Sequence, residues 1–181
     1  MQKVVNITQE QIREANYIKI LQYLKRYGKA TKAELSNHLN VSHTTVNSYI
    51  QALTEKGFVV PYGRGNSSGG RKPVTIRLRP NVRYSFGLRF SPDTVYLILV
   101  NMIGEEIDEM SFAYPRAGGL PAALEQSRKE IFNMAAAHGI EKEKILGVGM
   151  AFPGLVDMDN LKLEYIPNLN VKDFSLAPFA R

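Results

Sequence analysis

The chain has 181 residues, 44% hydrophobic and 22% charged, a composition typical of a globular protein. It contains no cysteine, which excludes disulfides and thiolate metal sites within these residues. No apolar run approaches the roughly 20 residues of a membrane-spanning helix. The first residues, MQKVVNITQE, lack the apolar centre of a signal peptide, so the expected location is the cytoplasm.

Positive charge is concentrated in the first 80 residues. The net charge is +6, but residues 1–80 carry 13 Lys and Arg against 4 Asp and Glu, whereas residues 81–181 carry 10 against 13. The two parts therefore have net charges of +9 and −3. This asymmetry predicts two domains, 1–80 and 81–181, and a polyanion as the partner of the first. A protein surface that is merely basic would also explain the charge, and this alternative stays open here.

A first amphipathic helix is predicted over residues 8–27. Apolar residues recur there at the spacing of one helical face. They are Ile12, Ala15, Ile18, Leu21 (with its neighbour Ile20) and Leu24. Gly28 then suits the end of the helix.

Two shorter helices follow. Thr31 and Glu34 form a capping-box pattern, which predicts the start of a helix that buries Ala33, Leu35 and Leu39. After a turn at residues 40–42, Ser42 is an expected N-cap for a helix over about residues 43–55. Its inward residues are Val46, Ile50 and Leu53. Two short helices joined by a tight turn predict a helix-turn-helix.

The outward positions of the second of these helices carry small polar side chains, which allow close approach to base edges in the major groove. The candidate DNA-reading residues are His43, Thr44, Thr45, Asn47, Ser48 and Gln51. A three-helix packing unit with a solvated polar face is the alternative, and the helix pattern alone does not decide between them.

A glycine-rich stretch, GRGNSSGGRKP (63–73), lies between the predicted strands 58–60 and 74–78. A nucleotide-binding phosphate loop needs a helix after its glycines. Here Pro73 and a strand follow instead, and the GxxxxGK(S/T) spacing is absent. The stretch therefore predicts the tip of a β-hairpin wing that brings Arg64, Arg71 and Lys72 to DNA, with a solvated hairpin tip as the alternative.

Residues 81–181 predict an α/β domain. Strands are expected at 82–90, 94–102 and 106–114, followed by an amphipathic helix at about 121–138. The apolar run ILGVGMAF (145–152) is expected to form a strand that is buried on both faces. This element order gives a mixed sheet.

Four stretches of the chain resemble the ROK family, named for repressors, open reading frames and kinases, and especially its transcriptional repressors of sugar metabolism. These are LSNHLNVSHTTVNSYIQAL (35–53), GRGNSSGGRKP (63–73), GVGMAFPGLVD (147–157) and PNL (167–169). The resemblance implies a winged helix-turn-helix joined to the first lobe of an actin/hexokinase-like sugar-kinase body. The corresponding fold class is α+β for the head and α/β for the body.

The same resemblance separates a repressor from a kinase. Kinases of the family carry a phosphate loop of the form GxDxGGTK, and the matching residues 87–94 read GLRFSPDT. Arg89 stands where the Asp is expected, Pro92 has no N–H for a phosphate, and Asp93 would repel one. We therefore expect a sugar-responsive DNA-binding regulator, a repressor and not an enzyme. A ROK-type sugar kinase with an accessory N-terminal domain is the alternative.

The resemblance further implies a second lobe with a Cys/His zinc site, and the chain is expected to end after the first lobe. No cofactor or metal site is expected within it, because its histidines are scattered. Gly154 and Asn168 are the candidate sugar contacts, unless they only permit a turn and cap a loop. The expected partners are double-stranded DNA, a sugar or phosphosugar effector, and a second copy in a homodimer or higher homo-oligomer, with no membrane.

Overall fold

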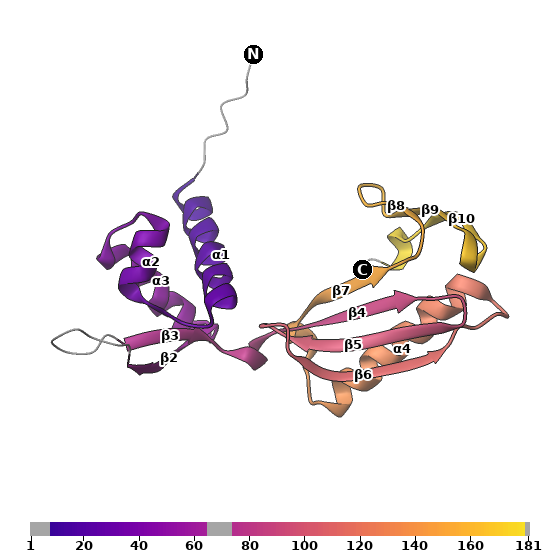
Figure 1. Ribbon diagram of the computed structural model, residues 1–181, viewed down its shortest axis with the longest axis horizontal. Coiled ribbons are helices and arrows are strands. Elements are labelled where there is room, and N and C mark those ends of the chain that lie inside the picture. The colour runs from indigo at the N-terminus through magenta and orange to yellow at the C-terminus, as the bar shows by residue number, and fades with distance from the viewer. Residues whose placement is uncertain (1–7, 65–73, 180–181) are drawn as a thin grey trace, which may run out of the picture. The chain divides into compact units, whose positions relative to one another are not determined.

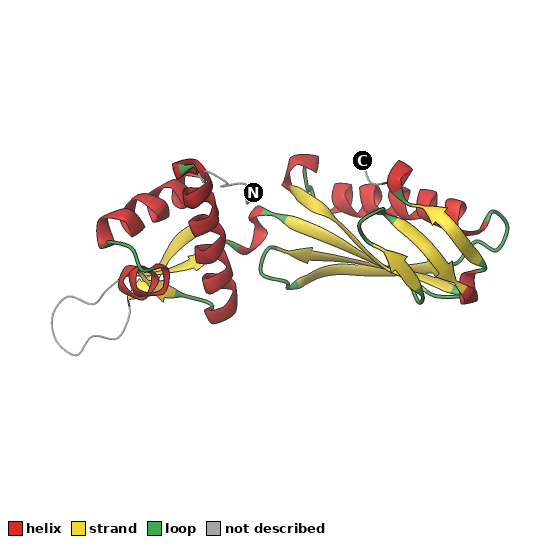
Figure 2. Ribbon diagram, turned by 90° about the horizontal axis from the view of Figure 1, so that it is seen from above, coloured by secondary structure: helices red, strands yellow, loops and turns green. Residues whose placement is uncertain are grey.

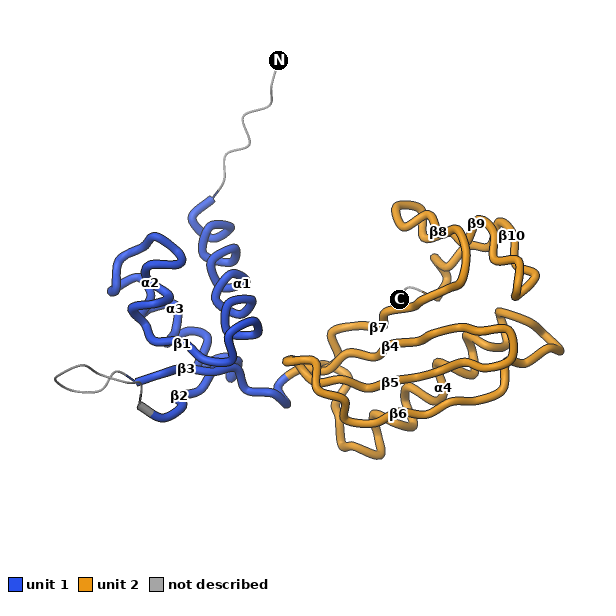
Figure 3. The backbone as a smooth tube through the Cα atoms, in the orientation of Figure 1, with its two compact units in different colours: residues 1–82 blue, residues 83–181 orange. Residues whose placement is uncertain are grey.

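The structure of the chain, a computed structural model, describes residues 8–64 and 74–179. It divides into two compact units, residues 1–82 and 83–181 (Figure 3). Within the described ranges, no helix is both long and apolar enough to cross a membrane.

The first unit is a winged helix, with three helices on a small antiparallel sheet of strand order β1-β3-β2 (Figure 1). Its elements are α1 (Gln9–Tyr27), β1 (Ala30–Thr31), α2 (Lys32–Leu39), α3 (His43–Glu55), β2 (Val59–Arg64) and β3 (Val74–Leu78).

Helix α1 begins with a capping box between Thr8 and Gln11. The apolar face predicted for this helix is partly wrong. Ile20 and Leu24 are buried, but Ile12 and Ile18 are 49% and 55% exposed, and Ala15 is exposed as well. The buried face instead includes a polar residue, Asn16, whose amide donates to the hydroxyl of Tyr49 on α3 at 3.2 Å. This hydrogen bond explains why the helix turns a polar side chain toward its neighbour.

Helix α2 begins at the predicted capping box of Thr31 and Glu34, which is confirmed. Leu35 is buried and Leu39 half-buried, but Ala33 is exposed, contrary to the prediction. Ser36 takes the second buried position, because its hydroxyl finds a partner in the turn that follows.

The second unit is built on a four-stranded sheet of order β6-β5-β4-β7, in which β7 runs parallel to β4 and the other pairs are antiparallel. Helix α4 lies along one face of this sheet (Figures 1 and 2). A smaller antiparallel sheet has the order β10-β9-β8. The mixed α/β class is confirmed. The elements are β4 (Tyr84–Phe90), β5 (Thr94–Asn101), β6 (Glu106–Ala113), α4 (Gly119–Ala137), β7 (Ile145–Ala151), β8 (Leu155–Asp157), β9 (Lys162–Ile166) and β10 (Val171–Ser175).

The core of the second unit lies between the sheet and α4. Alternate residues of β4 and β5 point into it, and α4 contributes its own apolar side. The main members are Phe86, Leu88, Phe90, Val95, Leu97, Leu99, Leu120, Ala123 and Leu124. The alternation of buried and less buried residues along β5 is the pattern of a strand that is covered on one face.

Strand β7 differs from the prediction that both its faces are buried. Leu146 is 65% exposed and Val148 is 40% exposed. The reason is topological, since β7 lies at the edge of the sheet and pairs with β4 alone among the described strands. An apolar run predicts a strand but does not state how many neighbours cover it.

Candidate nucleic-acid interface

The turn between α2 and α3 is held by two hydrogen bonds between Ser36 and Val41. Asn40 adopts a left-handed conformation with φ of 54°, and the N–H of Val41 donates to the carbonyl of Ser36 at 3.2 Å. The Ser36 hydroxyl in turn donates to the carbonyl of Val41 at 2.6 Å. These reciprocal bonds fix the direction in which α3 leaves the turn.

Helix α3 is anchored on its inner side by Val46, Ile50 and Leu53, all buried as predicted. Tyr49 adds a link to α1, because its ring meets the Tyr17 ring edge-on with centroids 5.5 Å apart. Its hydroxyl accepts the hydrogen bond from Asn16 described above. The opposite side of α3 is therefore held in a fixed orientation toward solvent.

Most of the DNA-reading residues predicted from the sequence lie on this outward side of α3. The exposed ones are His43, Thr44, Asn47, Ser48 and Gln51. The Gln51 amide donates to the carboxylate of Glu55 at 3.0 Å, one turn further along. Thr45 differs from the others, because it is half-buried and its hydroxyl lies 2.8 Å from that of the N-cap Ser42.

The start of α3 presents positive potential. Ser42 satisfies the N–H of Thr45 at 3.1 Å, and the first turn contains no acidic residue. The N-terminus of a helix favours anions through its free N–H groups and its dipole. His43 and Thr44, both exposed, lie in this first turn.

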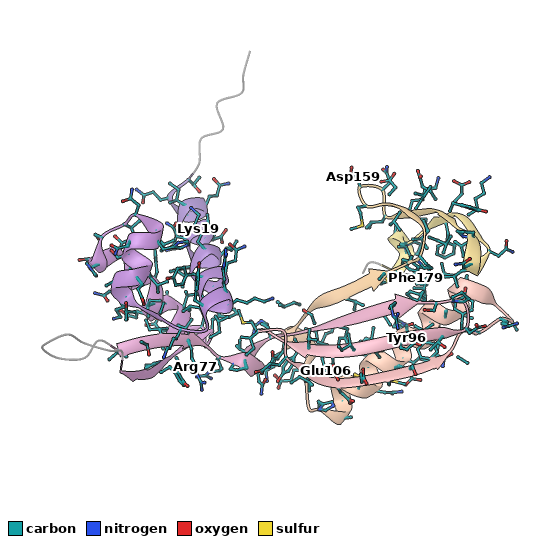
Figure 4. The ribbon with its side chains drawn as sticks, viewed as in Figure 1. Lys19, Arg77, Tyr96, Glu106, Asp159 and Phe179 are labelled. Atoms are coloured by element: carbon teal, nitrogen blue, oxygen red, sulfur yellow. The ribbon has the colours of Figure 1, made fainter. Side chains whose placement is uncertain are left out.

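Three of the four acidic side chains in the described part of the first unit make local contacts. Glu34 accepts the Thr31 N–H at 2.6 Å, Glu55 accepts from Gln51, and Glu10 lies 3.6 Å from the guanidinium of Arg13. Basic side chains outnumber them and are exposed; Lys19 and Arg77 are labelled in Figure 4. The exposed basic residues in the described part of this unit are Arg13, Lys19, Lys25, Arg26, Lys29, Lys32, Lys56, Arg77 and Arg79.

The wing predicted from the sequence is present as the β2–β3 hairpin. Val60 lies opposite Arg77 and Arg64 opposite Val74, with an irregularity between Pro61 and Arg64. The predicted contacts Arg71 and Lys72 lie outside the described residues, as does the side chain of Arg64.

The base of the wing holds a pair of residues that sequence reasoning missed. The Arg77 guanidinium lies 4.2 Å from the centre of the Tyr62 ring, and Tyr62 is 44% exposed. The Thr75 hydroxyl donates to the Tyr62 carbonyl and ties the two strands together. Arg77 is an outward residue in the alternating stretch VTIRL, which was a usable signal.

In the second unit, the β4–β5 hairpin contains residues 87–94, which the sequence analysis compared with the kinase phosphate loop. Its turn is closed by a bond from the Ser91 N–H to the Thr94 carbonyl at 2.9 Å. The Arg89 guanidinium stacks 4.1 Å from the centre of the Tyr96 ring, which is labelled in Figure 4. Asp93 pairs with Arg116 at 2.7 Å. Both charged side chains that depart from the kinase pattern thus have partners within the unit.

The two candidate sugar contacts, Gly154 and Asn168, differ in their surroundings. Asn168 lines a cavity of about 640 Å³ beside the start of α4, and Gly154 does not. A Cβ on Gly154 would overlap the carbonyl oxygen of Tyr165 and lie 2.6 Å from Cδ1 of Ile166. Close approach of β9 therefore explains this glycine without a ligand.

Asp157, the last residue of β8, is held by hydrogen bonds from the turn that follows. Asp157 accepts hydrogen bonds from the N–H of Asn160 at 3.0 Å and from its side-chain amide at 2.7 Å. These bonds hold the pKa of Asp157 below its usual range. The carboxylate stays charged and stabilises the turn. Among the described residues, no group of three His, Cys, Asp or Glu side chains could hold a metal ion.

Comparison with known proteins agrees with this geometry. Residues 14–60 match a family of winged helix-turn-helix DNA-binding domains. A candidate xylose repressor of a Caldicellulosiruptor strain is 28% identical over 165 residues, covering 91% of this chain and 41% of the relative. The xylose repressor of Bacillus spizizenii is 27% identical over 173 residues, covering 93% and 43%.

A solved structure extends the match to the fold. The ROK family transcriptional regulator that is a homologue of the Escherichia coli Mlc protein aligns with a TM-score of 0.69 and 18% identity. The alignment covers 92% of this chain and 42% of that one. The resemblance to the ROK family is confirmed. The chain spans about two fifths of the length of the two xylose-repressor relatives that it matches.

Proposed function

We propose that the protein is a sequence-specific DNA-binding transcriptional regulator of sugar metabolism. It acts as a repressor, and a sugar or phosphosugar modulates its DNA binding. The observation that carries this proposal is the outward side of α3, where small polar side chains are held at the positive start of a rigid helix. The names of the matched relatives, both xylose repressors, support repression and a sugar effector.

DNA recognition would combine two kinds of contact. Helix α3 enters the major groove, where the amides of Asn47 and Gln51 suit the donor and acceptor pair of an adenine edge. Basic residues of the same unit bind phosphates and release counterions, which supplies affinity without sequence preference. The wing lies along the flanking minor groove, with Arg64, Arg71 and Lys72 as its contacts.

Regulation would follow from placing the first units of two protein copies on one DNA duplex. A homodimer places its reading helices on half-sites about 34–36 Å apart, or a multiple of that distance. An effector favours the arrangement of the body to which it binds more tightly, and the change in DNA affinity cannot exceed that difference. Because DNA is the partner, the proposed place of action is the cytoplasm.

The kinase alternative has less support from the second unit. Pro92 offers no N–H for a phosphate, Asp93 carries the wrong charge, and Arg89 stacks on Tyr96. A cheap test is thermal unfolding with ATP and Mg²⁺, because a ligand at 100 times its dissociation constant adds about 2.7 kcal/mol of stability. An unchanged melting temperature at saturating ATP would exclude the kinase alternative.

The direct test of the proposal is binding to random-sequence duplex DNA at several salt concentrations, followed by selection of an operator. A contact set of about 6–10 phosphates predicts roughly a 10³- to 10⁵-fold loss of affinity between 50 and 200 mM salt. On the selected operator, Asn47→Ala should weaken binding, whereas the matched control Asn133→Ala, on exposed α4 surface, should not. Binding that does not respond to salt, or equal loss in both variants, would refute the proposal.

A further inference from the structure

Helix α1 carries apolar side chains on two of its sides. One side packs on the rest of the first unit and buries Ile20 and Leu24. The other side carries Ile12, Ala15 and Ile18, which are all exposed, the two isoleucines at 49% and 55%. At about 100° per residue, Ile18 lies about 160° around the helix from Ile20, so it points away from the core of its own unit. The three exposed residues form the α1 stripe.

The composition of the α1 stripe differs from that of an ordinary solvated helix surface. Isoleucine is a weaker helix former than Glu, Lys or Gln, because its branched side chain loses rotamer freedom in a helix. Single exposed apolar residues are common on protein surfaces. Here three of them follow one another at intervals of three residues, the spacing of a helix side that packs against another element. The α1 stripe therefore indicates a contact that a single first unit does not supply.

Two charged residues, Glu14 and Lys19, flank the line that joins Ala15 and Ile18. Both are exposed, and Lys19 is labelled on α1 in Figure 4. Neither makes an ion pair or a hydrogen bond within residues 8–64 and 74–179. They are five residues apart and lie on opposite edges of this line, so they do not face each other within one helix. Each charge is thus available to a partner that covers the α1 stripe.

A second copy of α1 that runs parallel to the first matches both the stripe and its charges. In a parallel helix pair, the line through Ala15 and Ile18 faces the same line of the other copy. A residue on one edge then faces the residue five positions further along on the opposite edge of its partner, which is the relation between Glu14 and Lys19. By symmetry the ion pair forms twice. An antiparallel pair brings equal edges together and forms neither ion pair.

This pairing leaves the outward side of α3 open to DNA. Helix α3 contacts the other side of α1, where the Asn16 amide donates to the Tyr49 hydroxyl at 3.2 Å. Asn16 lies about 160° around α1 from Ile18, so a helix that covers Ile18 does not displace α3. The two functions of the first unit, contact with DNA and contact with a second copy, therefore use different surfaces.

We propose that the α1 stripe joins the first units of two copies of this chain as a parallel helix pair, with Glu14 of each copy against Lys19 of the other. The inference rests on the proposed function, because it names the surface that holds two DNA-binding units together on two half-sites. Three apolar side chains from each copy make a small interface, which is weak alone. Its effect on DNA binding comes from linking two reading helices, which raises the effective concentration of the second.

The first test is disulfide cross-linking, because the chain has no cysteine and a single introduced thiol reports one position. In the parallel pair, residue 18 lies opposite residue 18 of the second copy, within the roughly 4.4–6.8 Å between Cα atoms that a disulfide spans. Mild oxidation of the whole chain carrying Ile18→Cys should therefore give a covalent dimer. Arg13→Cys is the matched control, because Arg13 is exposed on the same helix about 140° from Ile18, and it should stay mostly monomeric.

The second test is charge reversal, read as self-association of the whole chain in sedimentation equilibrium without DNA. Glu14→Lys or Lys19→Glu alone should weaken association about three- to thirty-fold, because each removes two ion pairs and sets like charges together. The double variant restores opposite charges and should return to within about three-fold of the unchanged chain. Ile18→Gln should weaken association while leaving the melting temperature unchanged, since the side chain is exposed in a single copy.

Three results would overturn the inference. The first is equal cross-linking of Ile18→Cys and Arg13→Cys, and the second is a double charge variant that associates no better than the single ones. The third is protection of the Ile18→Cys thiol from alkylation that does not depend on protein concentration, which would place the chain's own second unit on the stripe. Salt-dependent DNA binding is measured on the same samples. DNA binding without the α1 contact refutes this inference alone, and the α1 contact without DNA binding refutes the proposed function alone.

Discussion

Gly154→Ala should destabilise the second unit through packing, whether or not a sugar binds there. A Cβ at this position would overlap the Tyr165 carbonyl oxygen, approach the Ile166 Cα at 3.0 Å and meet Ile166 Cδ1 at 2.6 Å. The Cδ1 atom can rotate away, but the backbone of β9 cannot move freely, because β9 pairs with both β8 and β10. Overpacking of this kind costs about 1–3 kcal/mol, and contact with a fixed backbone places this case near the upper end.

The assay is urea and thermal unfolding of the whole chain, with Gly149→Ala as the matched control. Gly149, like Gly154, has no positive φ, but the nearest atom to its Cβ would be the Phe86 carbonyl oxygen at 3.9 Å, an ordinary contact. The control should therefore be neutral or slightly stabilising. For a unit of about 100 residues, a loss of about 2–3 kcal/mol lowers the melting temperature by roughly 8–24 °C. Equal stability of the two variants would refute the packing explanation of Gly154.

Three further predictions concern single contacts. Asn47→Ala should change base preference at one or two positions of the operator, at about 1–3 kcal/mol per lost contact. Arg77→Ala should instead weaken binding to all DNA sequences alike. Competition binding on operator variants distinguishes the two effects. Ser36→Ala leaves the Val41 carbonyl without its 2.6 Å donor, so urea unfolding should show a loss of about 1–3 kcal/mol. The hydrogen bond from His138, at 2.7 Å, lowers the pKa of Asp108 below 3.8. The stabilisation from this hydrogen bond is therefore fully present above pH 3.8 and is lost as the pH falls through the lowered pKa of Asp108. Asp108→Asn should remove this contribution to the acid dependence of the urea midpoint.

Local signals in the sequence predicted the helices of the first unit. The capping box at Thr31 and Glu34 and the spacing of Val46, Ile50 and Leu53 depend on neighbours within a few turns, so they can be read directly. Long-range partners could not be read in this way. Asn16 is buried because Tyr49, 33 residues away, accepts its hydrogen bond, and nothing near Asn16 indicates this.

In the second unit, the sequence predicted strands but not their burial or their neighbours. Residues 145–151 form a strand as the apolar run predicts, but their burial depends on what lies beside the sheet, which the run itself does not encode. The short strands β8, β9 and β10 were not anticipated, because three to five residues with mixed polarity carry too little periodicity. Their packing places Asn168 and Lys172 on the same cavity wall as Tyr114, across more than 50 residues of sequence.

The β4–β5 hairpin contains the residues that the sequence analysis compared with the phosphate loop of ROK kinases. A phosphate loop for catalysis must present free N–H groups and hold its charges ready for metal and nucleotide. Here Arg89 is stacked on Tyr96 and Asp93 is paired with Arg116, so these charges are engaged within the unit. The Asp93–Arg116 pair also borders the cavity at the start of α4. The charged side chains of this hairpin are therefore held by partners within the unit and are not left free for a phosphate.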